Sequence, residues 1–214
     1  MRTVGKVNNY YGGMNRMHIK LFRIFIICIG LMISFTVNAQ AACNHFFQWT
    51  WKQSTDGLMV KDLTSADFPS VIASSWYAWN GINDNVSLSY TTSVSSTEED
   101  INLYDEALTG STLAYTAAYK KTLGIWSQVS ITDFSGNISK AIIVFDNRND
   151  DEGRFVRQSH ERRTKTTIHE LGHALGLHHP TCLQSSVMHQ GFPDDDYVSA
   201  VVTDHDEEML RVKW

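Results

Sequence analysis

His169 and His173 lie four residues apart in a stretch whose composition favours a helix. Residues four apart lie on the same face of a helix, one turn apart, so the two imidazoles can bind one metal ion. Zinc accepts imidazole nitrogen, and catalytic zinc sites use three protein ligands and leave a fourth position for water. The pair therefore predicts part of a zinc site and requires a third ligand.

Gly176 and His179 follow at offsets that supply this ligand. A glycine can adopt a left-handed conformation at low cost, so the helix can end at Gly176 and the chain can turn back. The turn would bring His179 to the metal. His178 is a competing ligand whose offset differs by one residue. The alternative is a helix with surface histidines that binds no metal and has no catalytic role. The spacings of His169, His173, Gly176 and His179 together argue against it.

Glu170 directly follows the first histidine. A carboxylate there can flank the metal without binding it, take a proton from a zinc-bound water and deliver it to a leaving amine. We therefore predict a zinc endopeptidase that hydrolyses internal peptide bonds. The alternative is a zinc-binding adhesion or interaction protein on the same fold, with restricted or no catalysis. Glu170 argues against this alternative because binding alone needs no base.

The run from His169 to His179 resembles the zinc signature of the metzincin clan and is most similar to that of the matrixins, the matrix metalloproteinase family. Ser186-Val187-Met188 resembles the Met-turn that underlies the zinc in this clan, with core packing as the alternative role of Met188. The helix Phe68–Asn80 and the segment Gly110–Ala114 are similar to the first long helix and the edge strand of the family. Pro180 departs from the family, which usually has Ser or Thr there.

The resemblance implies a zincin-like α+β fold. Its parts would be a twisted, mostly parallel five-stranded sheet, two long helices, a Met-turn and a C-terminal helix. It also implies that a protein or peptide substrate binds in extended form along the edge strand near Leu113–Thr116, and we expect a monomer.

Sequence patterns alone also predict strands and helices in an intermixed order. Alternating or continuous apolar runs indicate strands at 57–62, 85–92, 100–105, 111–119 and 140–145. A helical pattern runs from about residue 163 to 177. A last helix begins near Thr203 or Asp204 and ends among basic residues, as the helix dipole favours.

The N-terminal residues 1–39 have the pattern of a secretory signal peptide, with Met17 as an alternative start. A basic stretch precedes the apolar residues 24–37, and Val37-Asn38-Ala39 is a small-x-small cleavage pattern. An uncleaved membrane anchor is the alternative, but the apolar run is shorter than the roughly 20 residues that a spanning helix needs. We expect residues 40–214 to form one secreted catalytic domain, extracellular or periplasmic.

Removal of residues 1–39 would leave 13 basic and 23 acidic residues. The resulting net negative charge disfavours nucleic-acid binding. It would also leave two cysteines, Cys43 and Cys182, which we expect to form a disulfide in an oxidising compartment. Two separate thiols are the alternative. A third reading, in which Cys43 binds the zinc and keeps the enzyme latent, lacks the surrounding family motif.

Acidic and amide residues cluster between Asp146 and Glu152, directly after a predicted strand. Oxygen ligands suit calcium, and matrixins bind calcium near the equivalent place. The loop is therefore a candidate calcium site, with a solvated acidic loop as the alternative.

Overall fold

The structure is a computed structural model that describes residues 43, 45–65, 69–93, 100–150, 154–192 and 194–214. The chain divides into residues 1–44 and the compact unit His45–Trp214, which contains all the candidate metal ligands. The predicted signal peptide lies outside the described residues. Among the described helices, none is both long and apolar enough to cross a membrane.

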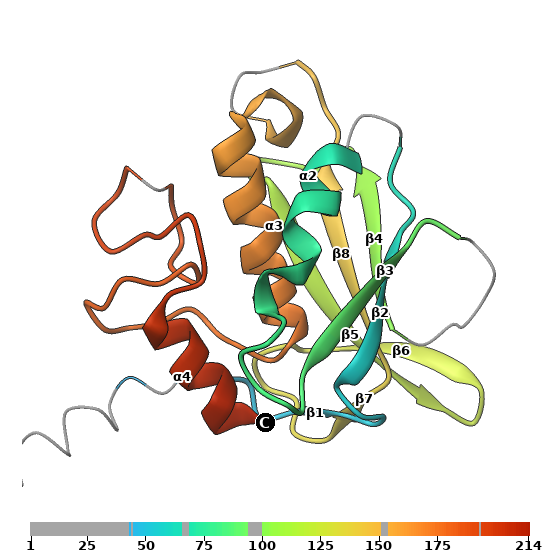
Figure 1. Cartoon of the computed structure of the whole chain (residues 1–214). Helices are drawn as coiled ribbons and strands as arrows, with labels where there is room; N and C mark the ends of the chain where they lie inside the picture. Colours follow the sequence, from blue (N-terminus) through green and yellow to red (C-terminus); the bar gives the residue numbers. More distant parts are fainter. Residues whose placement is uncertain (1–42, 44, 66–68, 94–99, 151–153, 193) are drawn as a thin grey trace, which may run out of the picture. The chain divides into compact units, whose positions relative to one another are not determined.

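A six-stranded sheet forms the centre of this unit, in the order β3-β2-β4-β8-β5-β6 (Figure 1). The strands are β2 (Asp56–Asp62), β3 (Ser87–Thr91), β4 (Ile101–Glu106), β5 (Ala114–Thr122), β6 (Ile125–Val129) and β8 (Lys140–Asp146). Strands β3, β2, β4 and β8 are parallel, whereas β5 is antiparallel to both β8 and β6. The predicted α+β class with a mostly parallel sheet is confirmed, and β6 is a sixth strand that the sequence analysis missed.

Strand β5 is only partly an interior strand. It pairs with β8 over Ala114–Tyr119, but with β6 only over Ala118–Thr122. Between Ala114 and Ala117 it therefore has a ladder partner on one side only, among the described residues. This open edge overlaps the segment near Leu113–Thr116, along which the resemblance implied that a substrate binds.

A second, two-stranded sheet joins β1 (Thr50–Trp51) to β7 (Asn137–Ile138) in parallel register. The aromatic segment around β1 is largely buried, with Trp49 and Trp51 in the core. The indole nitrogen of Trp51 donates a hydrogen bond to the carbonyl of Ala174, 3.0 Å away. The early aromatic segment is thereby attached to the helix that carries the paired histidines.

The helices are α2 (Pro69–Ser75), α3 (His160–Ala174) and α4 (Asp204–Lys213), with short 3₁₀ turns η2 (Trp76–Trp79) and η3 (Phe155–Arg157). Helix α3 packs on β5 and β8, and α2 lies beside α3. The Trp79 indole donates to the carbonyl of Ile168 at 2.9 Å, which attaches η2 to α3. Thr203 caps α4 and forms a reciprocal capping box with Asp206, close to the predicted start of the last helix.

The predicted first long helix, Phe68–Asn80, is shorter than expected. Phe68 lies outside the described residues, and the α-helical part ends at Ser75, after which the chain tightens into η2. The Asn80 side chain then bonds both backbone groups of Leu88, donating at 2.9 Å and accepting at 2.7 Å. These contacts with β3 fix the end of the helical segment before Gly81, which has φ +79°.

Gly172, in the middle of α3, lies directly against the residues beneath the helix. A Cβ at this position would come within 2.4 Å of Met188 Sδ and 2.8 Å of Trp79 Cζ2. Both neighbours are fully buried. The absence of a side chain at Gly172 is therefore what allows α3, the methionine and the tryptophan to pack in contact.

We predict that Gly172→Ala destabilises the protein, although alanine normally stabilises a helix interior relative to glycine. Overpacking of a filled core costs about 1–3 kcal/mol, which for a domain of this size lowers the Tm by roughly 5 °C. Thermal unfolding followed by circular dichroism measures the change. An unchanged or higher Tm would show that the close contact is not restrictive.

Candidate metal centre

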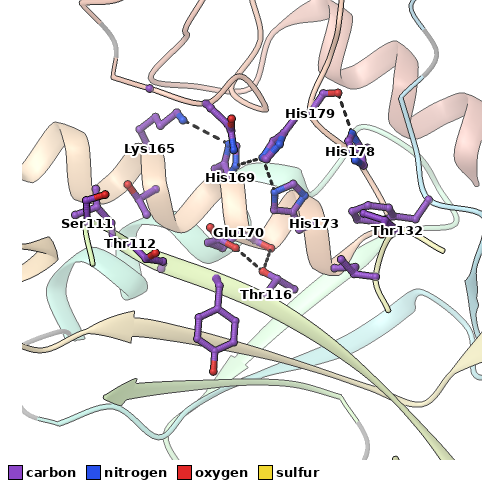
Figure 2. A pocket seen from close by; sticks show the side chains of 18 residues that line it. Ser111, Thr112, Thr116, Thr132, Lys165, His169, Glu170, His173, His178 and His179 are labelled. Atoms are coloured by element: carbon purple, nitrogen blue, oxygen red, sulfur yellow. Dashed lines mark hydrogen bonds between the residues drawn. The ribbon is translucent and has the colours of Figure 1, made fainter. Parts of the chain in front are cut away.

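Helix α3 places the first two candidate ligands on its buried face. The helix begins after Ser159, whose hydroxyl accepts a hydrogen bond from Arg162 N, and residues 165–174 are all buried. His169 and His173 therefore point from successive turns into the same region, with ring centroids 4.7 Å apart (Figure 2). The four-residue spacing positions the pair as the sequence indicated.

The turn after α3 brings the third histidine back to the first two. Gly176 has φ +95°, a conformation that glycine adopts at little cost. The chain from the N-terminal side holds this turn, since Phe47 N donates to the carbonyl of Gly176 and His178 N donates to that of His45, each at 2.7 Å. His179 then lies with its ring centroid 4.7 Å from that of His173.

The Nε2 atoms of the three histidines converge at one point. Nε2 of His179 lies 3.1 Å from that of His169 and 3.0 Å from that of His173. A tetrahedral zinc ion with Zn–N bonds of about 2.0–2.1 Å would hold its nitrogen ligands roughly 3.3 Å apart, so the spacing suits zinc. These three form the one candidate metal cluster among the described residues, and His178 does not belong to it.

Backbone carbonyls fix the orientation of both helical rings. Nδ1 of His169 lies 2.8 Å from the carbonyl of Val187, and Nδ1 of His173 lies 2.8 Å from that of Leu177. A carbonyl can only accept, so each Nδ1 carries the proton and each Nε2 presents a lone pair to the centre. Metal-binding histidines are commonly held by such outer contacts.

Burial keeps the three rings neutral. Burial, with a smaller contribution from neighbouring histidines, lowers the pKa of His173 to about 3 and that of His179 to about 4. The pKa of His169 is likewise far below its usual range, mainly through burial. Neutral imidazole is the form that binds metal, so the rings do not need to lose protons at neutral pH.

Glu170 lies beside the cluster and contacts strand β5. Its Oε2 lies 2.6 Å from the hydroxyl of Thr116, whose single proton can bond either this oxygen or the Glu170 carbonyl at 3.0 Å. Burial raises the pKa of Glu170 to about 7, although the Thr116 bond and the charge of Lys165 lower it. The carboxylate is therefore desolvated and oriented by a neighbouring strand.

Lys165 is a buried lysine one turn before His169, with 4% of its surface exposed. Its Nζ donates to the carbonyl of His189 at 2.7 Å and lies 3.4 Å from His169 Nδ1. Since that Nδ1 already donates to Val187, its contact with Lys165 is not a hydrogen bond. Burial lowers the pKa of Lys165 to about 8, and the acidic groups around it oppose this shift.

The predicted Met-turn lies beneath the histidines and is held by α4. Met188 is fully buried against Gly172. The buried carboxylate of Asp206 accepts hydrogen bonds from the hydroxyl of Ser186 and from Val187 N, the latter at 2.9 Å. The same carboxylate accepts from the backbone of Thr203 at 2.9 Å. One side chain thus joins the turn to the start of the last helix.

An open cleft of about 500 Å³ lies over the histidine cluster. Its lining combines the segment 111–116 with Lys165, the three histidines, Glu170 and the loop residues Gln190 and Gly191. The open edge of β5 thus runs along the same cleft as the candidate metal ligands. An extended chain could reach both.

Two acidic residues at the loop after β8 form ion pairs with arginines. Asp146 is buried and accepts from Arg148 Nε at 2.9 Å, with Arg154 3.7 Å away. Burial raises the pKa of Asp146, but the bonds from Arg148 and from the backbone of Leu108 hold it below its usual range. Asp150 pairs with Arg154 at 3.1 Å. Residues 151–153 lie outside the described residues, so the calcium site stays a prediction.

The predicted Cys43–Cys182 disulfide is not found in the described part of the chain. Sγ of Cys182 instead lies 3.5 Å from Nε2 of His205, at the start of α4. The ring of His205 in turn lies 4.9 Å from that of His45. The bridge is therefore not confirmed.

The sequence analysis missed the roles of three residues around the site: Thr116 contacts Glu170, Lys165 contacts His169, and Asp206 holds the Met-turn. Thr116 was included only in a substrate-binding segment, and Asp206 only within the predicted last helix. A lysine four residues before His169 shares its helix face, and this spacing was the one available signal. The contacts of Thr116 and Asp206 span 54 and 19–20 residues and follow from the fold alone.

Comparison of the chain with protein-family models and with curated proteins finds no match. Among solved structures it is similar to myroilysin, with 15% sequence identity and a TM-score of 0.45 over 76% of this chain and 94% of that chain. It is also similar to high choriolytic enzyme 1, a hatching enzyme zinc-protease from Oryzias latipes (medaka fish), with 14% identity, a TM-score of 0.40, and coverage of 76% and 92%. Neither is described as a matrixin, so that resemblance stays a prediction.

The metal centre predicts that the protein binds about one zinc per chain. His169→Ala and His179→Ala should each lose it during dialysis against a chelator, because two ligands rarely retain zinc. His178→Ala is the matched control and should retain it. Elemental analysis measures the zinc content, and full retention in both ligand variants would refute the assignment.

The contacts of Asp206 predict a large loss of stability in Asp206→Ala, with a free energy of unfolding lower by about 3 kcal/mol. The reason is that buried donors on the Met-turn and at the helix start would lose their shared acceptor. Asp204→Ala, at an exposed position in the first turn of the same helix, is the control and should cost less than about 1 kcal/mol. Urea unfolding compares the two, and equal losses would contradict the role of Asp206.

Proposed function

We propose that this protein is a zinc-dependent endopeptidase in which His169, His173 and His179 bind the metal and Glu170 acts as the general base. One observation carries the proposal: three neutral imidazoles converge beside a desolvated carboxylate, in a cleft bordered by an open strand edge. A structural zinc site would need neither the carboxylate nor the cleft.

The metal and the residues divide the chemistry between them. Zinc, when bound, supplies a Lewis acid that polarises a carbonyl and favours deprotonation of water. Glu170 accepts a proton from the attacking water and returns it to the amine that leaves when the peptide bond breaks. Thr116 orients this carboxylate through the 2.6 Å contact with Oε2. The backbone carbonyls of Val187 and Leu177 keep the rings of His169 and His173 aimed at the centre.

The open edge of β5 suits an extended protein or peptide substrate. Backbone groups between Ala114 and Ala117 have a ladder partner only in β8, so a substrate strand can pair with the other side. Thr116 lies in this segment and also touches Glu170, so a chain paired there would pass beside the base. This edge binds the main chain and by itself selects no side chain.

We also propose, from the sequence alone, that the enzyme is exported and acts as a monomer outside the cytoplasm. The signal pattern of residues 1–39 supports export. A Cys43–Cys182 disulfide that forms after export belongs to the same proposal.

Glu170→Gln tests the function. The variant should keep its zinc and its fold but hydrolyse a peptide library about 10²–10⁴-fold more slowly, because the amide cannot accept a proton. Glu161→Gln, at an exposed position on the same helix, is the matched control and should cleave at the wild-type rate. Mass spectrometry of the products gives rates and cleavage positions. Turnover near wild type in Glu170→Gln, with zinc still bound, would rule out this mechanism.

A further inference from the structure

The hairpin between β5 and β6 ends in an unusual turn. Both central residues are left-handed, with φ +51° at Leu123 and +83° at Gly124. Such turns favour asparagine or aspartate before glycine, and a leucine in this conformation is strained. The Leu123 side chain is 97% exposed, so burial in the core does not offset the strain. Ile125, directly after the turn, is 68% exposed.

Lysine and aromatic side chains lie behind these two aliphatic residues. Lys120 and Lys121 precede the turn on β5, and Nζ of Lys121 lies 5.0 Å from the ring centroid of Trp126 on β6. Lys140 of the neighbouring strand β8 contacts the same ring at 4.1 Å. Residues 114–132 contain no acidic residue, in a chain whose net charge is −5.

The hairpin extends from the sheet on the side away from α4 (Figure 1). Its tip is therefore accessible to a broad surface without obstruction by that helix. Strand geometry places Leu123 about 23 Å from Thr116, seven residues earlier, because a strand rises roughly 3.3 Å per residue.

We propose that this hairpin tip, defined as Lys120, Lys121, Leu123, Ile125 and Trp126, binds an anionic lipid surface. Leu123 and Ile125 insert into the apolar boundary of the membrane, and Trp126 lies at the level of the headgroups, where amphipathic aromatic rings are favoured. The lysines keep their ammonium groups among the lipid phosphates while their stems follow the insertion. The inference does not depend on the proposed protease activity.

The shape and charge of the tip favour a membrane over a protein partner. A stable protein interface buries roughly 800 Å² on each partner, usually over a broad patch, whereas here the exposed aliphatics are two side chains on a narrow turn. Insertion into lipid needs no matching surface. The local positive charge in an otherwise acidic chain selects anionic lipid.

A bound tip would hold the cleft at a fixed distance from the membrane. Strand β5 carries both the tip and the open edge, so the edge would lie within about 23 Å of the lipid boundary. A cleft in that position meets membrane-associated chains more often than freely diffusing ones.

Vesicle binding tests the proposal on the full chain, with phosphatidylcholine vesicles that contain or lack phosphatidylglycerol. Leu123→Ser combined with Ile125→Ser should weaken partitioning to the anionic vesicles about tenfold or more. Lys120→Ser and Lys121→Ser should each weaken it about fivefold, and only for the anionic vesicles. Leu183→Ser and Lys52→Ser alter exposed residues elsewhere and should leave binding unchanged.

A second readout distinguishes membrane binding by the tip from membrane binding by the apolar residues 24–37, which are the same in every variant. Lipids brominated near the headgroup should quench tryptophan fluorescence more in the wild type than in Trp126→Phe. Equal quenching in the two proteins would overturn the proposal, as would unchanged partitioning of the Leu123 and Ile125 variant. If the wild type self-associates without lipid and the Leu123 and Ile125 variant does not, the tip binds a second copy of the chain. That result would likewise overturn the proposal.

Discussion

Three uncharged imidazole rings must converge in a largely buried place, with Nε2 of His179 about 3 Å from that of each of the other two, and most of the fold serves this constraint. Two rings are fixed by their positions on one helix and by carbonyls that hold their protonated nitrogens. The helix is fixed in turn by indole bonds from Trp51 and Trp79. Gly172 lets Met188 pack directly against the helix. The rings of His169 and His173 are thus positioned by main chain, and His179 completes the group on the turn that follows their helix.

Local patterns accounted for much of the architecture. The four-residue spacing of His169 and His173 needs only helix geometry, and the left-handed Gly176 needs only the absence of a Cβ. The interior strand β8 was visible as a continuous apolar run, and α4 as a capped, charge-graded helix. These features depend on residues within a turn or two of each other, so one sequence contains the relevant information.

Features that depend on distant contacts could not be predicted in the same way. The contact of Thr116 with Glu170 requires a particular placement of α3 on β5, which no local pattern records. The first helix tightens at Ser75 because Asn80 bonds the next strand. Strand β6 was missed because Leu123 occupies a turn position where asparagine or glycine is the usual signal. Tertiary contacts decided the first two of these features, and an unusual turn residue concealed the third.

The attachment of the turn around Gly176 to His45 and Phe47 has a consequence for the order of folding. These partners are about 130 residues apart in the sequence, so the contact closes a very long loop, whose entropy must be overcome before the contact forms. The two histidines of α3 are close as soon as that helix exists. The hydrogen bonds that hold the turn before His179 form only once the segment around His45 has met it. A nascent chain emerging from the ribosome therefore carries an incomplete site until nearly all of it has been synthesised.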